Sequence, residues 1–215
     1  MNPMRFAPAL RKLTFTTHVT TSVGWIGAAL VFLALAAIGL ISEDERTVRG
    51  AYLVMAPAGW LVLVPLAHAS LLSGIALSLG TPWGLFRHYW VVLKLIISAF
   101  STVVLMIYMG TFRQMAGVAA DPVVELGLVR NPSPLVHAIL ALVLLLVATV
   151  LGVYKPFGMT GYGLRQSGAT VRRADRTAPE PLGTRNWLYI AATATVVLVV
   201  LLLLAHLLSG GLHSH

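Results

Sequence analysis

Residues 134–154 read PLVHAILALVLLLVATVLGVY, a run without a single Asp, Glu, Lys or Arg. A helix needs about 20 apolar residues to cross the hydrocarbon core of a bilayer. Four further runs are long enough and predominantly apolar: residues 15–41, 51–79, 84–110 and 187–208. Because backbone groups in lipid must satisfy their own hydrogen bonds, each run is predicted to be an α-helix. The sequence therefore predicts an all-α, polytopic transmembrane helix bundle with five spans.

The composition indicates that lipid is the main solvent of this chain. Of its 215 residues, 58% are hydrophobic and 10% are charged, whereas soluble domains carry about 25% charged residues. No stretch outside the apolar runs is long enough for a core of its own, so residues 1–215 are predicted to form one integral membrane domain. The absence of cysteine excludes disulfides, iron–sulfur clusters and cysteine nucleophiles. No nucleotide-binding loop or catalytic triad supports an enzymatic function.

The basic residues predict the orientation of the spans. With the N-terminus in the cytoplasm, only Arg46, Arg49, Arg113 and Arg130 of the 15 basic residues fall outside. The positive-inside rule favours this arrangement, which puts the C-terminus outside after an odd number of spans. Residues 155–185 then form a flexible, basic cytoplasmic loop that rests on anionic lipids. The positive charge is thus interpreted as topology and lipid contact, and nucleic acid is not an expected partner.

The connections between spans contain signals for the ends of helices. Gly80, Thr81 and Pro82 suit the end of one helix and the first turn of the next, which predicts a tight hairpin between spans two and three. Before span four, Ser133 is predicted to cap the helix and Pro134 to occupy its first position.

Five of the seven histidines, His18, His68, His88, His137 and His206, lie in or at the ends of the apolar runs. An ionisable side chain at membrane depth is costly and commonly marks a functional site. His18 and His88 fall at similar cytoplasmic depth on different predicted helices. Haem iron accepts imidazole ligands from facing helices, so this pair is predicted to hold a haem b. The alternative is that both are interfacial residues bonded to lipid or backbone.

The remaining histidines are weaker candidates for cofactor binding. His68 follows the helix-kinking Pro65 and either lines the site or is a neutral side chain bonded to a carbonyl or a serine. His137 is a candidate ligand of a second, outer site, with His206 as a weaker partner. Methionines near His137 allow a copper site, although ordinary packing is the better interpretation. They are Met55, Met106, Met109 and Met115.

Lys94 is a charged residue within the third predicted span. Such a lysine marks a proton or anion site, or it reaches the headgroups with its ammonium group. The predicted spans contain no Asp or Glu, which argues against a pump that uses a carboxylate relay.

Three stretches carry a family resemblance: HVTTSVGW at 18–25, LGTPWGLFRHYW at 79–90 and VYKPFGMT at 153–160. Together they resemble an uncharacterised family of bacterial integral membrane proteins that is distantly similar to the membrane domain of copper-resistance D proteins. The resemblance covers spans one to four. It implies a small polytopic protein of the inner membrane and places His18, His88 and His137 inside family motifs, but it implies no activity.

Two functional hypotheses follow from these observations. The first is a b-type haem protein of the bacterial inner membrane, with histidine axial ligands, that passes electrons between a quinone or a redox partner protein and the other side. The second is a non-redox membrane protein: a permease for a small solute or a metal, or an accessory subunit of a membrane complex.

Overall fold

The computed structural model describes residues 6–128, 130, 132–155, 158–166, 191 and 194–202. Within these ranges the secondary structure is helical and contains no strand, which confirms the predicted all-α class. The helices are α1 (Pro8–Ile41), α2 (Glu45–Ala58), α3 (Val64–Leu79), α4 (Tyr89–Ala120), α5 (Ser133–Tyr154) and the short α6 (Gly161–Gln166). A π-helical turn, Gly59–Leu63, joins α2 and α3 into one rod, and a 3-10 turn, Leu126–Leu128, precedes α5.

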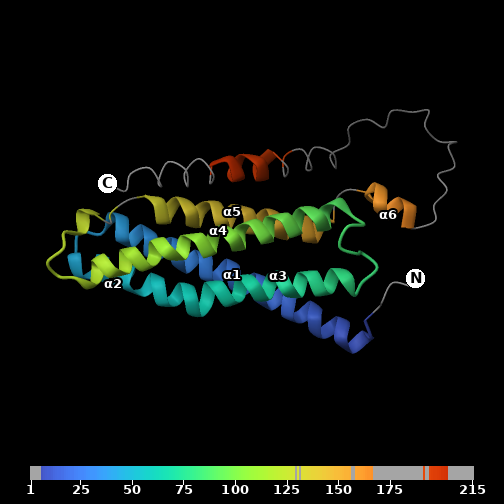
Figure 1. Cartoon of the computed structure of the whole chain (residues 1–215), viewed down its shortest axis with the longest axis horizontal. Coiled ribbons are helices and arrows are strands. Elements are labelled where there is room, and N and C mark those ends of the chain that lie inside the picture. Colours follow the sequence, from blue (N-terminus) through green and yellow to red (C-terminus); the bar gives the residue numbers. More distant parts are fainter. Residues whose placement is uncertain are drawn as a thin grey trace.

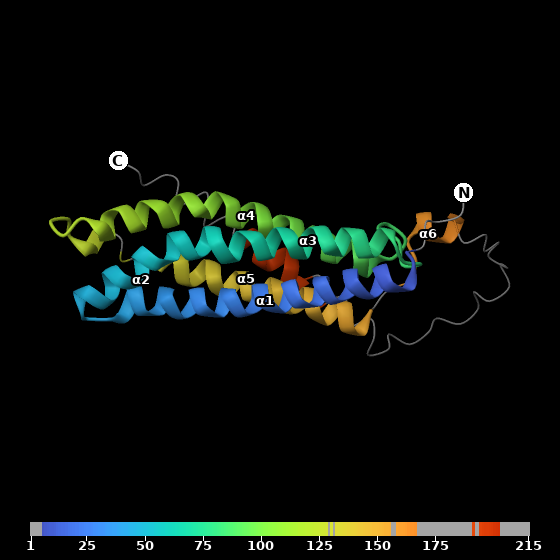
Figure 2. The ribbon, with the colours of Figure 1, turned by 90° about the horizontal axis from the view of Figure 1, so that it is seen from below.

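Four rods lie side by side along the long axis of the molecule, as Figure 1 and Figure 2 show. They are α1, the combined α2–α3 rod, α4 and α5, and consecutive rods run in opposite directions. Among the described residues, four helices are long and apolar enough to cross a membrane: Pro8–Ile41, Glu45–Leu79, Tyr89–Ala120 and Ser133–Tyr154. α1 packs along α3 and α5, while α2 packs along α4. These four rods correspond to the first four predicted spans.

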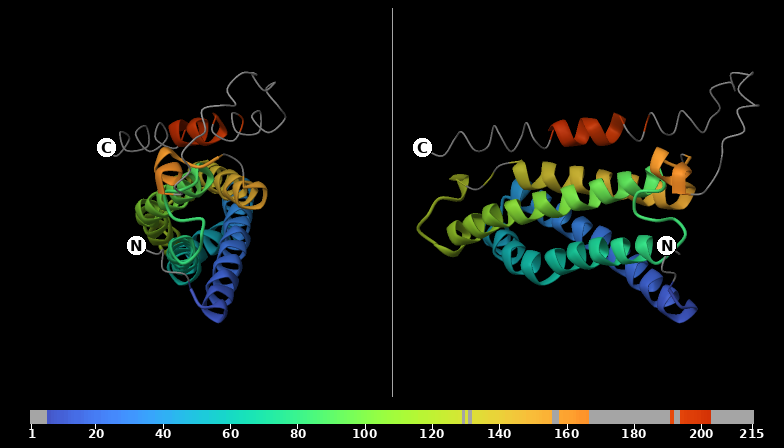
Figure 3. Two further views of the ribbon diagram at one scale, coloured as in Figure 1. Left: turned by 90° about the vertical axis from the view of Figure 1, so that its right-hand side faces the viewer. Right: turned by 45° about the vertical axis from the view of Figure 1, so that its right-hand side comes forward.

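The fifth predicted span, residues 187–208, is described only in part. Residue 191 and residues 194–202 are helical, and this segment lies beside α5 in both views of Figure 3. Val196 and Val199 are buried against apolar side chains of α4 and α5. His206 lies outside the described residues, so its predicted role as a partner of His137 stays a prediction.

The two ends of the bundle differ in charge. At one end α1 and α4 begin and α3 and α5 end; this end is called the basic end below. Its charged residues among those described are Arg11, Lys12, Arg87, Lys94, Lys155 and Arg165. The opposite end carries every described acidic residue: Glu43, Asp44, Glu45, Asp121 and Glu125.

A capping interaction fixes the start of α2 at the opposite end. The Asp44 carboxylate accepts hydrogen bonds from the backbone N–H of Thr47, at 3.2 Å, and from the Thr47 hydroxyl. This is the usual way in which an N-cap carboxylate satisfies a free N–H group of the first turn. Both hydrogen bonds hold the pKa of Asp44 below its ordinary value, because they stabilise the charged carboxylate.

The third span begins later than the sequence predicted. Pro82 lies in the loop between α3 and α4 and not in the first turn of α4. Gly84 has a φ of +61°, a left-handed conformation that interrupts a helix, and His88 is extended. α4 therefore starts at Tyr89 and continues to Ala120, ten residues past the predicted end. The predicted tight hairpin is wrong for the same reason.

The start of α5 is close to its prediction, but the cap differs. Ser133 is the first helical residue, and the residue before the helix is Pro132. The Ser133 hydroxyl does not cap the helix, because it forms a 2.8 Å hydrogen bond with the hydroxyl of Tyr108 on α4. A tertiary contact has thus replaced the predicted local one.

Part of the predicted flexible loop 155–185 has a defined structure. The backbone N–H of Thr160 donates to the carbonyl of Arg87 at 2.9 Å, and its hydroxyl donates to the carbonyl of Phe86 at 2.6 Å. These bonds fix the segment that leads into α6 against the α3–α4 loop. The other residues of 155–185, namely 156, 157 and 167–185, lie outside the described residues.

Three of the four methionines predicted as possible copper ligands are packed in the apolar core, and the fourth, Met106, is 39% exposed. Met55, Met109 and Met115 are buried in the cluster that joins α1, α2, α4 and α5. A Cβ atom on Gly59 would lie 2.8 Å from the sulfur of Met109, so this glycine makes room for the methionine. Within the described residues, no group of three or more His, Asp or Glu side chains could hold a metal ion. These contacts support a packing role for the buried methionines in preference to copper binding.

Candidate functional site

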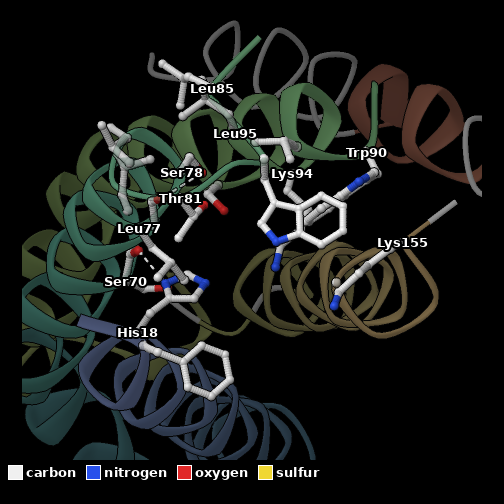
Figure 4. Close-up of a pocket in the computed structure, with 18 of the residues that line it drawn as sticks. His18, Ser70, Leu77, Ser78, Thr81, Leu85, Trp90, Lys94, Leu95 and Lys155 are labelled. Atoms are coloured by element: carbon white, nitrogen blue, oxygen red, sulfur yellow. Dashed lines mark hydrogen bonds between the residues drawn. The ribbon is translucent and has the colours of Figure 1, made fainter. Parts of the chain in front are cut away.

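A cavity of about 420 Å³ opens at the basic end, between α1, α3, α4 and α5. Its charged and titratable lining residues are Arg11, Lys12, His18, Lys94 and Lys155. Its hydroxyl groups come from Ser70, Ser78, Thr81 and Ser98. No carboxylate from the described part of the chain lines the cavity. Figure 4 shows His18, Lys94 and Lys155 pointing from three different helices into one space.

His18 is held on α1 by its contacts with α3. Its Nδ1 lies 3.1 Å from the carbonyl oxygen of Ser70, which can only accept, so Nδ1 carries the proton. The Ser73 hydroxyl lies 3.3 Å from the same nitrogen. A Cβ atom on Gly74 would lie 3.0 Å from the ring, so a small residue is needed there. The other ring nitrogen, Nε2, faces the cavity in Figure 4.

The hydroxyl network continues deeper between α1 and α3. The hydroxyls of Ser22 and Ser70 form a 2.8 Å hydrogen bond, and Ser70 is itself buried. Small, hydrogen-bonding side chains allow two helices to approach closely in an apolar environment. This seam holds the imidazole of His18 in one orientation at the wall of the cavity.

Lys94 supplies a half-buried positive charge from α4. A Cβ atom on Gly152 of α5 would lie 2.7 Å from the Lys94 ammonium nitrogen, so the ammonium group packs directly against the backbone of α5 at this glycine and would have to move if a side chain were added there. Lys94 has no hydrogen bond or ion pair with any described residue. A buried charge without a partner is costly, and a bound anion would remove that cost.

The mouth of the cavity is also cationic. Arg11, Lys12 and Lys155 are exposed there, around the half-buried Lys94. Lys155 ends α5 in a left-handed conformation with a φ of +43°, and its ammonium group lies 5.1 Å from the centre of the Trp83 ring. Cation–π contacts of this kind hold a lysine side chain in place. Charges of one sign around a low-dielectric cleft raise the local concentration of ions of opposite sign.

His88 does not line this cavity. It lies directly before α4 and not on a helix, which corrects its predicted position in the third span. Its Nδ1 donates to the carbonyl of Trp83 at 2.8 Å, and its ring packs against the rings of Trp83 and Trp90, which do line the cavity. Two axial haem ligands need to face one cavity from opposite sides. The structure does not bring His18 and His88 into that arrangement.

The other two predicted histidines lie elsewhere. His68 is exposed on the outer surface of α3, with its Nδ1 2.8 Å from the carbonyl of Val64. His137 is buried on α5, with its Nδ1 2.9 Å from the carbonyl of Ser133 and its ring stacked on Tyr108 at 4.0 Å. The contact of His68 agrees with its predicted alternative, a histidine bonded to a carbonyl, whereas the carbonyl contact of His137 was not predicted.

Comparisons with known proteins add nothing to this geometry. No family model, curated protein or solved structure matches the chain. The site therefore has to be interpreted from its own chemistry.

Sequence reasoning named His18 and Lys94 but missed the residues that join them into one site. The sequence placed Lys155 only in the basic loop and did not single out Gly152, and it associated Gly74 with His68 and not with His18. The sequence feature that could have indicated these contacts is the presence of small residues on spans two and four, because small residues allow helices in membranes to approach closely. Which charged side chain meets each glycine depends on the tertiary arrangement of the helices.

Proposed function

We propose that this protein is a non-redox membrane protein that binds an anionic group in the cavity at its basic end. The chemistry fits a phosphate, sulfate or carboxylate group, carried either by a small solute or by a lipid headgroup. One observation carries the proposal: the ammonium group of Lys94 reaches a cavity without any described carboxylate to neutralise it. The hydroxyls of Thr81 and Ser98 add hydrogen-bond donors around the same space. The Ser78 hydroxyl, in contrast, donates to the carbonyl of Gly74 at 2.8 Å.

The size and charge of the cavity agree with this function. Small-molecule sites commonly have volumes of about 300 to 1,000 Å³, and this cavity has about 420 Å³. Lysine ammonium groups and hydroxyls are common partners of phosphate oxygens. The same positive charge would repel a metal ion, so the geometry supports an anion in preference to the metal permease that the sequence left open.

The proposed setting is the bacterial cytoplasmic membrane, with the basic end and the N-terminus in the cytoplasm and the C-terminus outside. The positive-inside rule supports this orientation, because the basic end carries six described basic residues and no described acidic one, whereas the opposite end carries four described basic residues and every described acidic one. Anionic lipids then surround the cytoplasmic mouth of the cavity. The membership in the bacterial membrane family named above is part of the same proposal.

An absorbance spectrum separates this proposal from the haem b hypothesis. A haem held by His18 and His88 predicts a Soret band in protein purified from haem-replete cells, with loss of the band in His18→Ala and in His88→Ala. Anion binding without redox chemistry predicts no Soret band and no change with dithionite. A band that both substitutions abolish would contradict the proposal and restore electron transfer to a quinone or a partner protein as the function.

Thermal unfolding of the purified protein in detergent tests anion binding. A ligand that binds only the folded state stabilises it by about 2.7 kcal/mol at a concentration of 100 times its Kd. We expect a saturable rise in Tm with inorganic phosphate or with phosphatidylglycerol, at constant ionic strength. A response to phosphate alone indicates a solute, and a response to the lipid alone indicates a headgroup.

Two variants on α4 make this test specific. Lys94→Met removes the cavity charge and is expected to abolish the rise in Tm. Arg113→Gln removes an exposed charge at the opposite end of the same helix and should leave the response intact. The proposal fails if neither ligand raises Tm, or if Lys94→Met responds as the unsubstituted protein does.

A further inference from the structure

A second, smaller cavity lies in the interior of the bundle. It has about 70 Å³ of space and is bounded by α1, the α2–α3 rod, α4 and α5. Most of its lining is apolar, but three polar side chains reach it: Ser101, Tyr108 and His137. A water molecule needs about 10 to 15 Å³ of such space and two to four polar partners. The cavity is therefore large enough and polar enough to contain water.

Ser101 is the polar residue that packing does not explain. It is 7% exposed, and its hydroxyl has no hydrogen-bond partner among the described residues. Buried polar groups nearly always have a partner, so an unpartnered hydroxyl at a cavity wall indicates a bound molecule. Tyr108 also lines the cavity. Its hydroxyl forms a hydrogen bond with the hydroxyl of Ser133 in the first turn of α5, so polar side chains continue from the cavity toward that end of α5. The cavity is thus connected by side chains to the opposite end of the bundle.

The two cavities lie in sequence along the bundle. On α4, Lys94 and Ser98 line the first cavity, and Ser101 and Tyr108 line the second. Ser101 follows Ser98 by three positions, which is a rise of about 4.5 Å along the helix. Less than one turn of α4 therefore lies between the two serines.

The other helices keep the same order. On α1, His18 lines the first cavity and Trp25 lines the second. On α5, Gly152 lines the first cavity and His137 lines the second. Three helices thus place the cavities at consecutive levels, so the arrangement does not depend on one side chain.

We propose that the two cavities are chambers of one route through the bundle, along which the anionic solute bound in the first chamber crosses the membrane. This inference rests on the proposed function and deepens it from anion binding to permeation of a small anion. In the observed conformation the route is closed. Ser70, which is hydrogen-bonded to Ser22, lines the first chamber, and the buried ring of Trp25 lines the second, so these side chains form the wall where the two levels meet along α1.

The absence of cysteine from the chain allows a direct test by labelling. Ser98→Cys places one thiol in the first chamber, and Ser101→Cys places one thiol in the second. Both substitutions change the volume of the side chain little. Val103→Cys is the matched control, because Val103 lies two residues from Ser101 but is 57% exposed on the outer surface of α4. A thiol in lipid stays protonated and reacts poorly with a charged reagent, since the thiolate is the reactive form.

The measurement uses an anionic, membrane-impermeant methanethiosulfonate on oriented membrane vesicles. We expect Ser98→Cys to react from the side of the basic end and Ser101→Cys to react from the opposite side. Both should react at least tenfold faster than Val103→Cys. Inorganic phosphate at saturating concentration should slow the reaction of Ser98→Cys.

The outcomes separate the route from the binding site. Reaction of Ser98→Cys without reaction of Ser101→Cys from either side would overturn the route and leave anion binding in place. If Ser98→Cys also reacts no faster than Val103→Cys, both proposals fail. Equal reaction of all three thiols from both sides would indicate a loosened bundle, and it also contradicts a closed, two-chamber route.

Discussion

Replacing Arg49 with alanine is expected to lower the free energy of unfolding by about 3 kcal/mol, because hydrogen bonds from a charged donor are worth about 1.5 to 3 kcal/mol each and are lost together here. The guanidinium of Arg49, on α2, donates to the carbonyls of Asp121 at 2.7 Å and Val124 at 3.0 Å, which follow α4. It also pairs with Glu45 at 2.7 Å. Reversible unfolding in mixed micelles measures the loss.

Two further substitutions identify the cause of this loss. Arg49→Lys keeps the charge but not the planar fork of donors, so it should recover only a minor part of the stability. Arg46→Ala removes a neighbouring exposed arginine and should change the free energy of unfolding by less than about 0.5 kcal/mol, as is usual for surface positions. Equal effects of Arg49→Ala and Arg46→Ala would contradict a bridge between α2 and the end of α4.

Lys94→Met is expected to make the protein more stable while it removes anion binding. A lysine in the middle of a membrane helix costs about 3 kcal/mol on insertion scales, and Lys94 lies nearer a helix end, so we expect a gain of about 1 kcal/mol in the absence of ligand. Methionine retains the length and flexibility of the side chain and fills the same space. The unfolding assay without phosphate measures the gain.

A stabilising substitution that abolishes binding is a signature of a charge kept for function. Lys94→Arg should retain anion binding, because a guanidinium also carries a permanent positive charge. If Lys94→Met destabilises the protein instead, the ammonium group has a structural partner, and the account of the cavity as an unneutralised anion site is wrong.

The helical class and the positions of the first four spans could be predicted, because each of these apolar runs is long enough by itself to cross a bilayer as a helix. A run such as 134–154 has one stable conformation in lipid, whatever its neighbours are. The ends of helices depend on more distant contacts. The sequence around Pro82 has the residues of a helix start, yet the helix begins at Tyr89, where the loop is held by Trp83, His88 and the segment that includes Thr160.

The candidate site could be predicted only in part. His18 and Lys94 are visible in the sequence because each interrupts an apolar run. Their meeting in one cavity depends on close helix contacts at Gly74 and Gly152, and the sequence does not say which helices touch there. His88 illustrates the same limit, since its depth was inferred from a helix that starts after it.

Isothermal titration of inorganic phosphate into the purified protein, at constant ionic strength, tests anion binding most directly. The structure predicts one saturable site per chain in the unsubstituted protein and in Arg113→Gln, and no measurable heat of binding in Lys94→Met. Binding of unchanged affinity in Lys94→Met would contradict the assignment of the cavity as an anion site. The absence of phosphate binding in all three proteins, together with the absence of a rise in Tm with phosphatidylglycerol, would contradict it as well.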